Sequence, residues 1–289
     1  MSLQNKFKII LVITLLAIVI GEGSLLFADY MAKRLPNAPK ECFAKESEYD
    51  KWICFRPYFD ELVNKVSPKY AMIEAKIFKE KKIIDDCHLN AHFIGEAALE
   101  KYNFNVGQAF AFGEFGCIEG YFHGVMERYV RYEADPYSVV SKVKNMCDTV
   151  SSPSFQKEGL LKSQCAHGIG HGLVAHNFLS VADALAACEG IDYEWRCRGG
   201  VAMEHVEQYL SLEENKLKEI LPEICEPFSG LDDSNAMSVC IDNIGATLMW
   251  YTKHDLARSK KLCEELEKPE YIRSCKSGTE TGEFINLTD

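Results

Sequence analysis

Residues 165–172 read Cys-Ala-His-Gly-Ile-Gly-His-Gly, and this short stretch carries the pattern that organises the whole chain. A cysteine opens it, a glycine follows three residues later, and two histidines stand four residues apart. Residues four apart share one face of a helix, so His167 and His171 would present their side chains together. Paired imidazoles at this spacing are typical of a metal site.

The same frame recurs along the chain and predicts a helical repeat. Six cysteines are each followed three residues later by glycine or asparagine: Cys87, Cys117, Cys165, Cys197, Cys240 and Cys275. Apolar residues at three- and four-residue spacing predict helices before the later copies, over 137–147, 180–188, 212–225 and 255–263. Pro222 is expected to kink or end the third of these early. Each unit is therefore predicted as a helix, a short loop closed by a disulfide and a second helix.

Such α-hairpins cannot each bury a core, so neighbouring units are expected to stack. The predicted fold is all-α, with about six disulfide-stapled α-hairpin repeats forming a curved solenoid or a closed helical ring. Successive units are separated by 30 to 48 residues, which argues against a regular solenoid. No strand-like alternation of useful length is present.

The cysteine count is even, at twelve, which favours a complete set of disulfides. Short separations predict sequential pairing: Cys42 with Cys54, Cys87 with Cys117, Cys147 with Cys165, Cys188 with Cys197, Cys225 with Cys240, and Cys263 with Cys275. The alternative, in which some cysteines are free metal ligands, is less favoured because the chain has no C-x-x-C pair.

The N-terminus predicts export. Lys6 and Lys8 precede an apolar stretch over 9–20 and a small-residue site at 21–23, the order found in secretory signals. A second apolar run at 24–28 leaves cleavage and membrane anchoring both open. Disulfides also fit an oxidising compartment, so the chain is expected to be extracytoplasmic, either secreted or anchored by this segment.

Three regions are predicted on this basis. Residues 1–28 form a signal peptide or N-terminal signal anchor, 29–60 form a less patterned lead-in, and 61–289 form a single α-helical repeat domain with a His/Glu-rich face on its first four units. The net charge of −11, without any basic cluster, excludes nucleic acid as an expected partner.

The polar face of the second helices carries the candidate ligands. Positions two, six and ten after the repeat cysteine share one helical stripe, occupied by Glu119, His123 and Glu127 in one unit. In the next units the same stripe holds His167 and His171, and then Glu207 with Glu204 beside the stripe. The Cys87 unit has the pattern displaced by one residue. The predicted metal ligands are His88, His92, His123, His167, His171, Glu127 and Glu204.

The stripe is poor in ligands in the last two units, where it carries Asp242, Ala246 and Trp250 and then Ser277 and Thr281. This gradient points to a site built on the first four units. Imidazole suits zinc, copper, iron and nickel, so copper or zinc is the first expectation and a carboxylate-bridged di-iron pair the second.

Two functions of different class remain open from the sequence. The first is an exported metal-binding protein, with catalysis at an open coordination position left undecided because no catalytic signature motif is present. The second is a metal-free, disulfide-stabilised helical scaffold that binds a membrane or exported protein, with the histidines as interior network residues. His176, His205 and His254 are interpreted as hydrogen-bonded or surface residues under either function.

Overall fold

A computed structural model describes residues 36–288, apart from 118, 134, 153–154, 210–211 and 230–235. Within these residues every regular element is a helix and no strand occurs, so the all-α prediction is confirmed. The predicted signal segment at 1–28 lies outside the described residues. In the described part of the chain, no helix combines the length and apolar character needed to cross a membrane.

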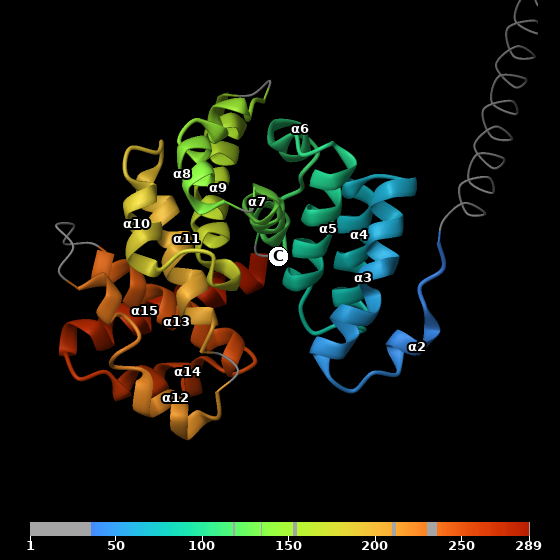
Figure 1. The fold of residues 1–289 in the computed structure, drawn as a ribbon. Helices are drawn as coiled ribbons and strands as arrows, with labels where there is room; N and C mark the ends of the chain where they lie inside the picture. Colours follow the sequence, from blue (N-terminus) through green and yellow to red (C-terminus); the bar gives the residue numbers. More distant parts are fainter. Residues whose placement is uncertain are drawn as a thin grey trace, which may run out of the picture.

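Long and short helices alternate along much of the chain (Figure 1). The longer helices are α3 (Glu48–Lys65), α4 (Pro68–Glu80), α5 (His88–Lys101), α7 (Gly120–Glu133), α9 (Phe155–Val174), α11 (Glu194–Glu207), α13 (Ala236–Tyr251) and α15 (Pro269–Thr288). The shorter ones are α2 (Lys40–Phe43), α6 (Val106–Ala111), α8 (Pro136–Val143), α10 (Val181–Cys188), α12 (Glu214–Ile220) and α14 (Leu256–Leu262).

The odd-numbered long helices from α3 to α15 pack one against the next in chain order. Figure 1 shows this progression, from α3 and α5 through α7 to α9 and α11, and then to α13 and α15. The short helices lie at the sides of this row, with α10 against α11 and α14 against α15. The consequence for function is that α5, α7, α9 and α11, which carry the candidate ligands, are consecutive neighbours.

Backbones of the neighbouring helices α9 and α11 touch at two glycines. A Cβ atom built on Gly170 of α9 would lie 2.0 Å from the carbonyl oxygen of Cys197, and one on Gly200 of α11 would lie 2.0 Å from that of His167. No side chain fits at that distance, so only glycine allows the two helices to come so close. Gly170, between His167 and His171, is therefore explained by the close approach of the α9 and α11 backbones.

All twelve cysteines are paired, and the six disulfides join the predicted partners. The pairs connect residues 9 to 30 positions apart, so each closes a local loop between helices. Six disulfides in one chain indicate an oxidising, extracytoplasmic environment. No cysteine is left as a thiolate ligand.

Helix boundaries differ from the sequence expectation in three places, one of them the helix expected over 137–147, which ends at Val143 as α8. The lead-in over 29–60 contains α2 and most of α3, because Ser47 caps the start of α3 and Phe55, Phe59 and Leu62 bury one face of it. The helix expected over 212–225 is shortened to α12, which stops at Ile220 before Pro222, as the proline predicts.

Candidate metal centre

The seven predicted ligands lie together in the structure, contributed by four neighbouring helices. Helix α5 carries His88 and His92, α7 carries His123 and Glu127, α9 carries His167 and His171, and α11 carries Glu204. They form three overlapping groups whose ligand atoms lie within 4.8 Å of one another: a first triad (His88, His92, His123), a second triad (His123, His167, His171) and a mixed group (Glu127, His171, Glu204).

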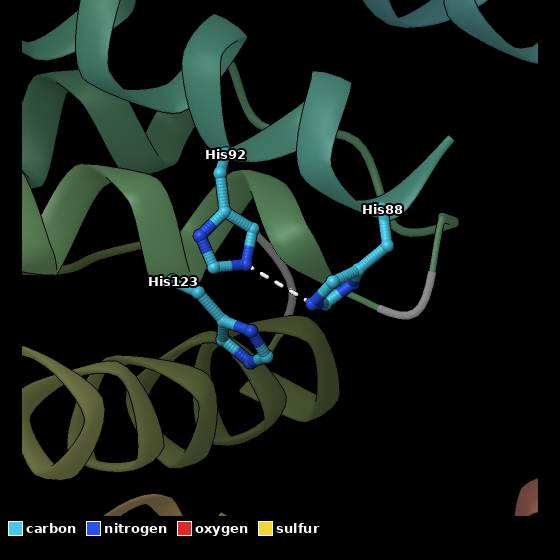
Figure 2. Close-up of side chains that lie close together, drawn as sticks. All are labelled: His88, His92 and His123. Atoms are coloured by element: carbon cyan, nitrogen blue, oxygen red, sulfur yellow. Dashed lines mark hydrogen bonds between the residues drawn. The ribbon is translucent and has the colours of Figure 1, made fainter. Parts of the chain in front are cut away.

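In the first triad two imidazoles from one helix meet at their Nε2 atoms (Figure 2). The Nε2 atoms of His88 and His92 are 3.0 Å apart. The Nδ1 atom of His88 lies 2.9 Å from the carbonyl oxygen of Cys117, and Nδ1 of His92 lies 3.2 Å from Oε2 of Glu127. In both rings Nδ1 is therefore fixed by an oxygen atom, and Nε2 points toward the other histidine of the pair.

The second triad repeats this arrangement on α9. Nδ1 of His167 lies 3.1 Å from the carbonyl oxygen of Arg196, and Nδ1 of His171 lies 3.1 Å from Oε2 of Glu204. Nε2 of His171 is buried and has no hydrogen-bond partner among the described residues. In metal sites a ligating histidine almost always binds through one nitrogen and donates from the other to a carbonyl or carboxylate. All four flanking histidines have such a partner at Nδ1.

His123 lies between the two pairs. Its ring centroid is 5.4 Å from those of both His88 and His92, 5.0 Å from that of His167 and 4.2 Å from that of His171. The residue is 1% exposed, and neither ring nitrogen has a hydrogen-bond partner in the described structure. A buried polar group without a partner costs about 1–3 kcal/mol, so this position needs an explanation.

Most of the cluster is held in the neutral form that binds metal. Burial, reinforced by the charge of His92, lowers the pKa of His88 to about 3. Burial and the surrounding imidazoles likewise hold the pKa values of His123 and His167 well below their usual range. A neutral imidazole has a lone pair to donate, so no proton has to be removed from these rings before an ion binds.

His92 is the exception, because it is paired with a carboxylate. Burial disfavours its charged form, but the charge and hydrogen bond of Glu127 outweigh burial and raise the pKa of His92 to about 9. The same pairing outweighs burial at Glu127 and lowers the pKa of that carboxyl group. In the absence of an ion, the protonated ring of His92 can therefore donate from Nδ1 to Glu127 and from Nε2 to Nε2 of His88.

Glu207 of α11 also faces this cluster and was not among the predicted ligands. Burial raises its pKa, while His171 acts to lower it and Glu204 to raise it, so these charges are close. It lies ten residues after Cys197, on the stripe that the sequence had already marked. Glu96, in contrast, is taken up by ion pairs of 2.7 Å with Arg56 and 2.8 Å with Arg131.

The remaining histidines lie outside the cluster. Nε2 of His205 is 2.8 Å from the carbonyl oxygen of Ile224, as expected of a buried hydrogen-bonded residue. His176 is exposed and lies 3.4 Å from Arg131. Neither belongs to a group of three possible ligands among the described residues.

A residue from the ligand-poor part of the chain completes the surroundings of the site. The indole of Trp250 on α13 lies with its ring centroid 4.9 Å from that of His88 on α5. Trp250 occupies the stripe position ten residues after Cys240. A late unit therefore also faces this centre, with an aromatic ring where the earlier units carry ligands.

No family model matches the chain, and neither the curated proteins nor the solved structures include a significant match. The function must therefore be argued from the site itself. What its geometry offers is a buried set of imidazoles, oriented by carbonyls and carboxylates, which is suited to coordinating a transition-metal ion.

Proposed function

We propose that this protein is an extracytoplasmic metal-binding protein whose histidine cluster, formed by the first and second triads, holds copper or zinc. The observation that carries the proposal is the orientation of the imidazoles. Four rings have Nδ1 next to an oxygen, and Nε2 of His171 and both nitrogens of His123 are buried with no hydrogen-bond partner among the described residues. A network that existed only for packing would satisfy these buried atoms.

The donor types favour copper or zinc. Both triads contain only imidazole, which suits these ions, and carboxylates enter only in the mixed group of Glu127, His171 and Glu204. A carboxylate-bridged di-iron pair would have to be built on that mixed group and remains the second choice. The net charge of −11 would attract any of these cations.

We also propose that the chain forms about six α-hairpin units that curl into a ring, and that its N-terminal segment directs export. The contact between Trp250 and His88 supports a curl, because it brings α13 next to α5. In a ring the stripes of successive units would point to one centre, which explains why the ligands converge.

The competing function is a metal-free scaffold in which the histidines only join repeats. The His92 and Glu127 pair, 3.2 Å apart, is the contact that such a network would need. Against it stands His123, because a network residue with two unsatisfied buried nitrogens destabilises the fold that it is supposed to hold together.

A calorimetric titration of the metal-free protein with zinc ions tests the proposal. We expect saturable binding whose stoichiometry is lower in the double variant His167→Ala/His171→Ala than in the wild type, because the variant loses two of the three ligands of the second triad and keeps the first triad. The matched control His176→Ala removes an exposed histidine of the same domain and should bind as the wild type does. Equal zinc binding by all three proteins would contradict the proposed site.

A further inference from the structure

We infer that the centre holds two ions rather than one, and that His123 bridges them, with one ring nitrogen bound to the ion in the first triad and the other to the ion in the second triad. This inference rests on the proposed metal-binding function and adds the number of ions and the ligand that couples them. It differs from a carboxylate-bridged pair, because the bridging group is an imidazole.

The first step is that each triad has the dimensions of a separate site. Two nitrogens that bind one ion at 2.0–2.1 Å are roughly 3 Å from each other. The Nε2 atoms of His88 and His92 are already 3.0 Å apart, with His123 beside them (Figure 2). This half of the centre needs little movement to accept an ion.

The second triad requires one ring to turn. The rings of His123 and His171 stack with 20° between their planes, whereas an ion must lie in the plane of each ring that binds it. If the imidazole of His171 or His123 rotates about its terminal side-chain torsion, one ion lies in the planes of both rings. That torsion is soft in histidine. His167 meets His171 at 71°, an angle already compatible with a shared ion.

The third step is that one ion cannot use all five histidines. Ring contacts connect His123 with both flanking pairs, but none joins a ring of α5 to a ring of α9. The two pairs therefore lie on opposite sides of His123. A single ion would leave one pair, and one nitrogen of His123, unused in the protein interior.

The bridge also has a simple proton balance. Binding of the first ion displaces the proton from Nε2 of His92 and uses the lone pair of neutral His123, and the second ion replaces the remaining ring proton of His123; both protons are released to solvent. The resulting imidazolate, together with Glu127 and Glu204, places three negative charges next to the four positive charges of two divalent ions. These charges offset most of the charge of the two ions, which favours their burial.

Copper(II) is the probe for the test, because two copper(II) ions joined by an imidazolate couple antiferromagnetically and lose their electron paramagnetic resonance signal. Metal-free protein is titrated with copper(II), and bound copper is measured by equilibrium dialysis alongside the signal intensity. We expect a signal that grows to one equivalent and then falls as the second ion binds, with saturation at two equivalents.

Variants assign the two ions to the two triads. The doubles His88→Ala/His92→Ala and His167→Ala/His171→Ala should each bind one copper(II) with a full signal, because one triad remains in each. His123→Gln should lose the coupling. If His123→Gln does not fold, the wild-type titration and the two doubles still decide the matter.

The outcomes separate this inference from the proposed function. Saturation at one equivalent, or two bound ions that keep their full signal, would overturn the bridge and leave a metal-binding protein. No saturable binding of copper(II) or zinc would overturn both. The bridge would be established if the wild type loses its signal at two equivalents and each double variant shows the full signal of one bound copper(II).

Discussion

At the scale of the residue, the site depends on which imidazole nitrogen is free. His171 is fully buried, with Nδ1 next to Glu204 and Nε2 facing the cluster. His171→Ala should therefore reduce metal content and lower the metal-dependent part of the melting temperature by the share of the second triad. Metal at one hundred times its Kd stabilises the native state by about 2.7 kcal/mol, and this increment should be lost. Melting curves with and without zinc measure it, and His176→Ala should keep the full increment.

The metal-free protein should also be most stable near neutral pH. His88 has a folded pKa lowered from 6.5 to about 3, so below pH 6.5 the unfolded chain takes up a proton that the folded chain does not, and stability falls with falling pH. His92 has a folded pKa raised to about 9, so its contribution is complete below 6.5 and lost as pH rises through 9. Melting temperatures measured with a chelator from pH 5 to 9 should fall on both sides, and a flat profile would contradict these assignments.

At the scale of the element, the glycines decide how closely the ligand-bearing helices pack. In Gly200→Ala the new Cβ would meet the carbonyl oxygen of His167, so α9 and α11 must separate, and we expect a loss of about 3 kcal/mol in unfolding free energy. Its neighbour Gly199 has nothing nearer than 3.6 Å, and Gly199→Ala should stabilise the helix by up to about 1 kcal/mol. Urea unfolding of the two variants tests the pair, and equal effects would show that close packing is not the reason for Gly200.

The first disulfide of the site should matter to metal binding as well as to stability. Cys87 directly precedes His88, and the carbonyl oxygen of Cys117 lies next to Nδ1 of His88. The disulfide between Cys87 and Cys117 therefore positions this ligand. Cys87→Ser/Cys117→Ser should cost about 2–4 kcal/mol and weaken copper(II) binding in the first triad. The control Cys263→Ser/Cys275→Ser, at the junction of α14 and α15, should cost stability without changing affinity. Equal copper(II) affinity in the two double variants would contradict this positioning role.

The sequence could predict those features of the fold and the site that depend on short spacings along the chain. The i, i+4 histidine pairs and the sequential cysteine pairs depend on local spacing, and the structure brings the seven predicted ligands together and forms the six predicted disulfides. The central place of His123 and the carbonyl partners at Cys117 and Arg196 depend on how neighbouring helices pack, which spacing does not encode. Glu207 was on the predicted stripe, but its burial beside His171 follows only from the same packing.

At the scale of the whole molecule, disulfides and tight helix contacts hold a row of helices in which buried imidazoles face one another. This arrangement is costly for a metal-free protein, because the unpartnered buried nitrogens of His123 and His171 favour unfolding, and so does the lowered pKa of His88 at acidic pH. A bound ion reverses that cost and makes the same residues stabilising. The histidine cluster and the disulfides would then be two parts of one stable extracytoplasmic fold.

The most direct test of the central claim is elemental analysis of the protein purified from an oxidising compartment without added metal, combined with melting curves before and after chelation. We predict copper or zinc in whole-number ratio to the chain, and a melting temperature that falls when the chelator removes it. Protein that contains no transition metal, and whose melting curve the chelator leaves unchanged, would contradict the account and favour a metal-free scaffold.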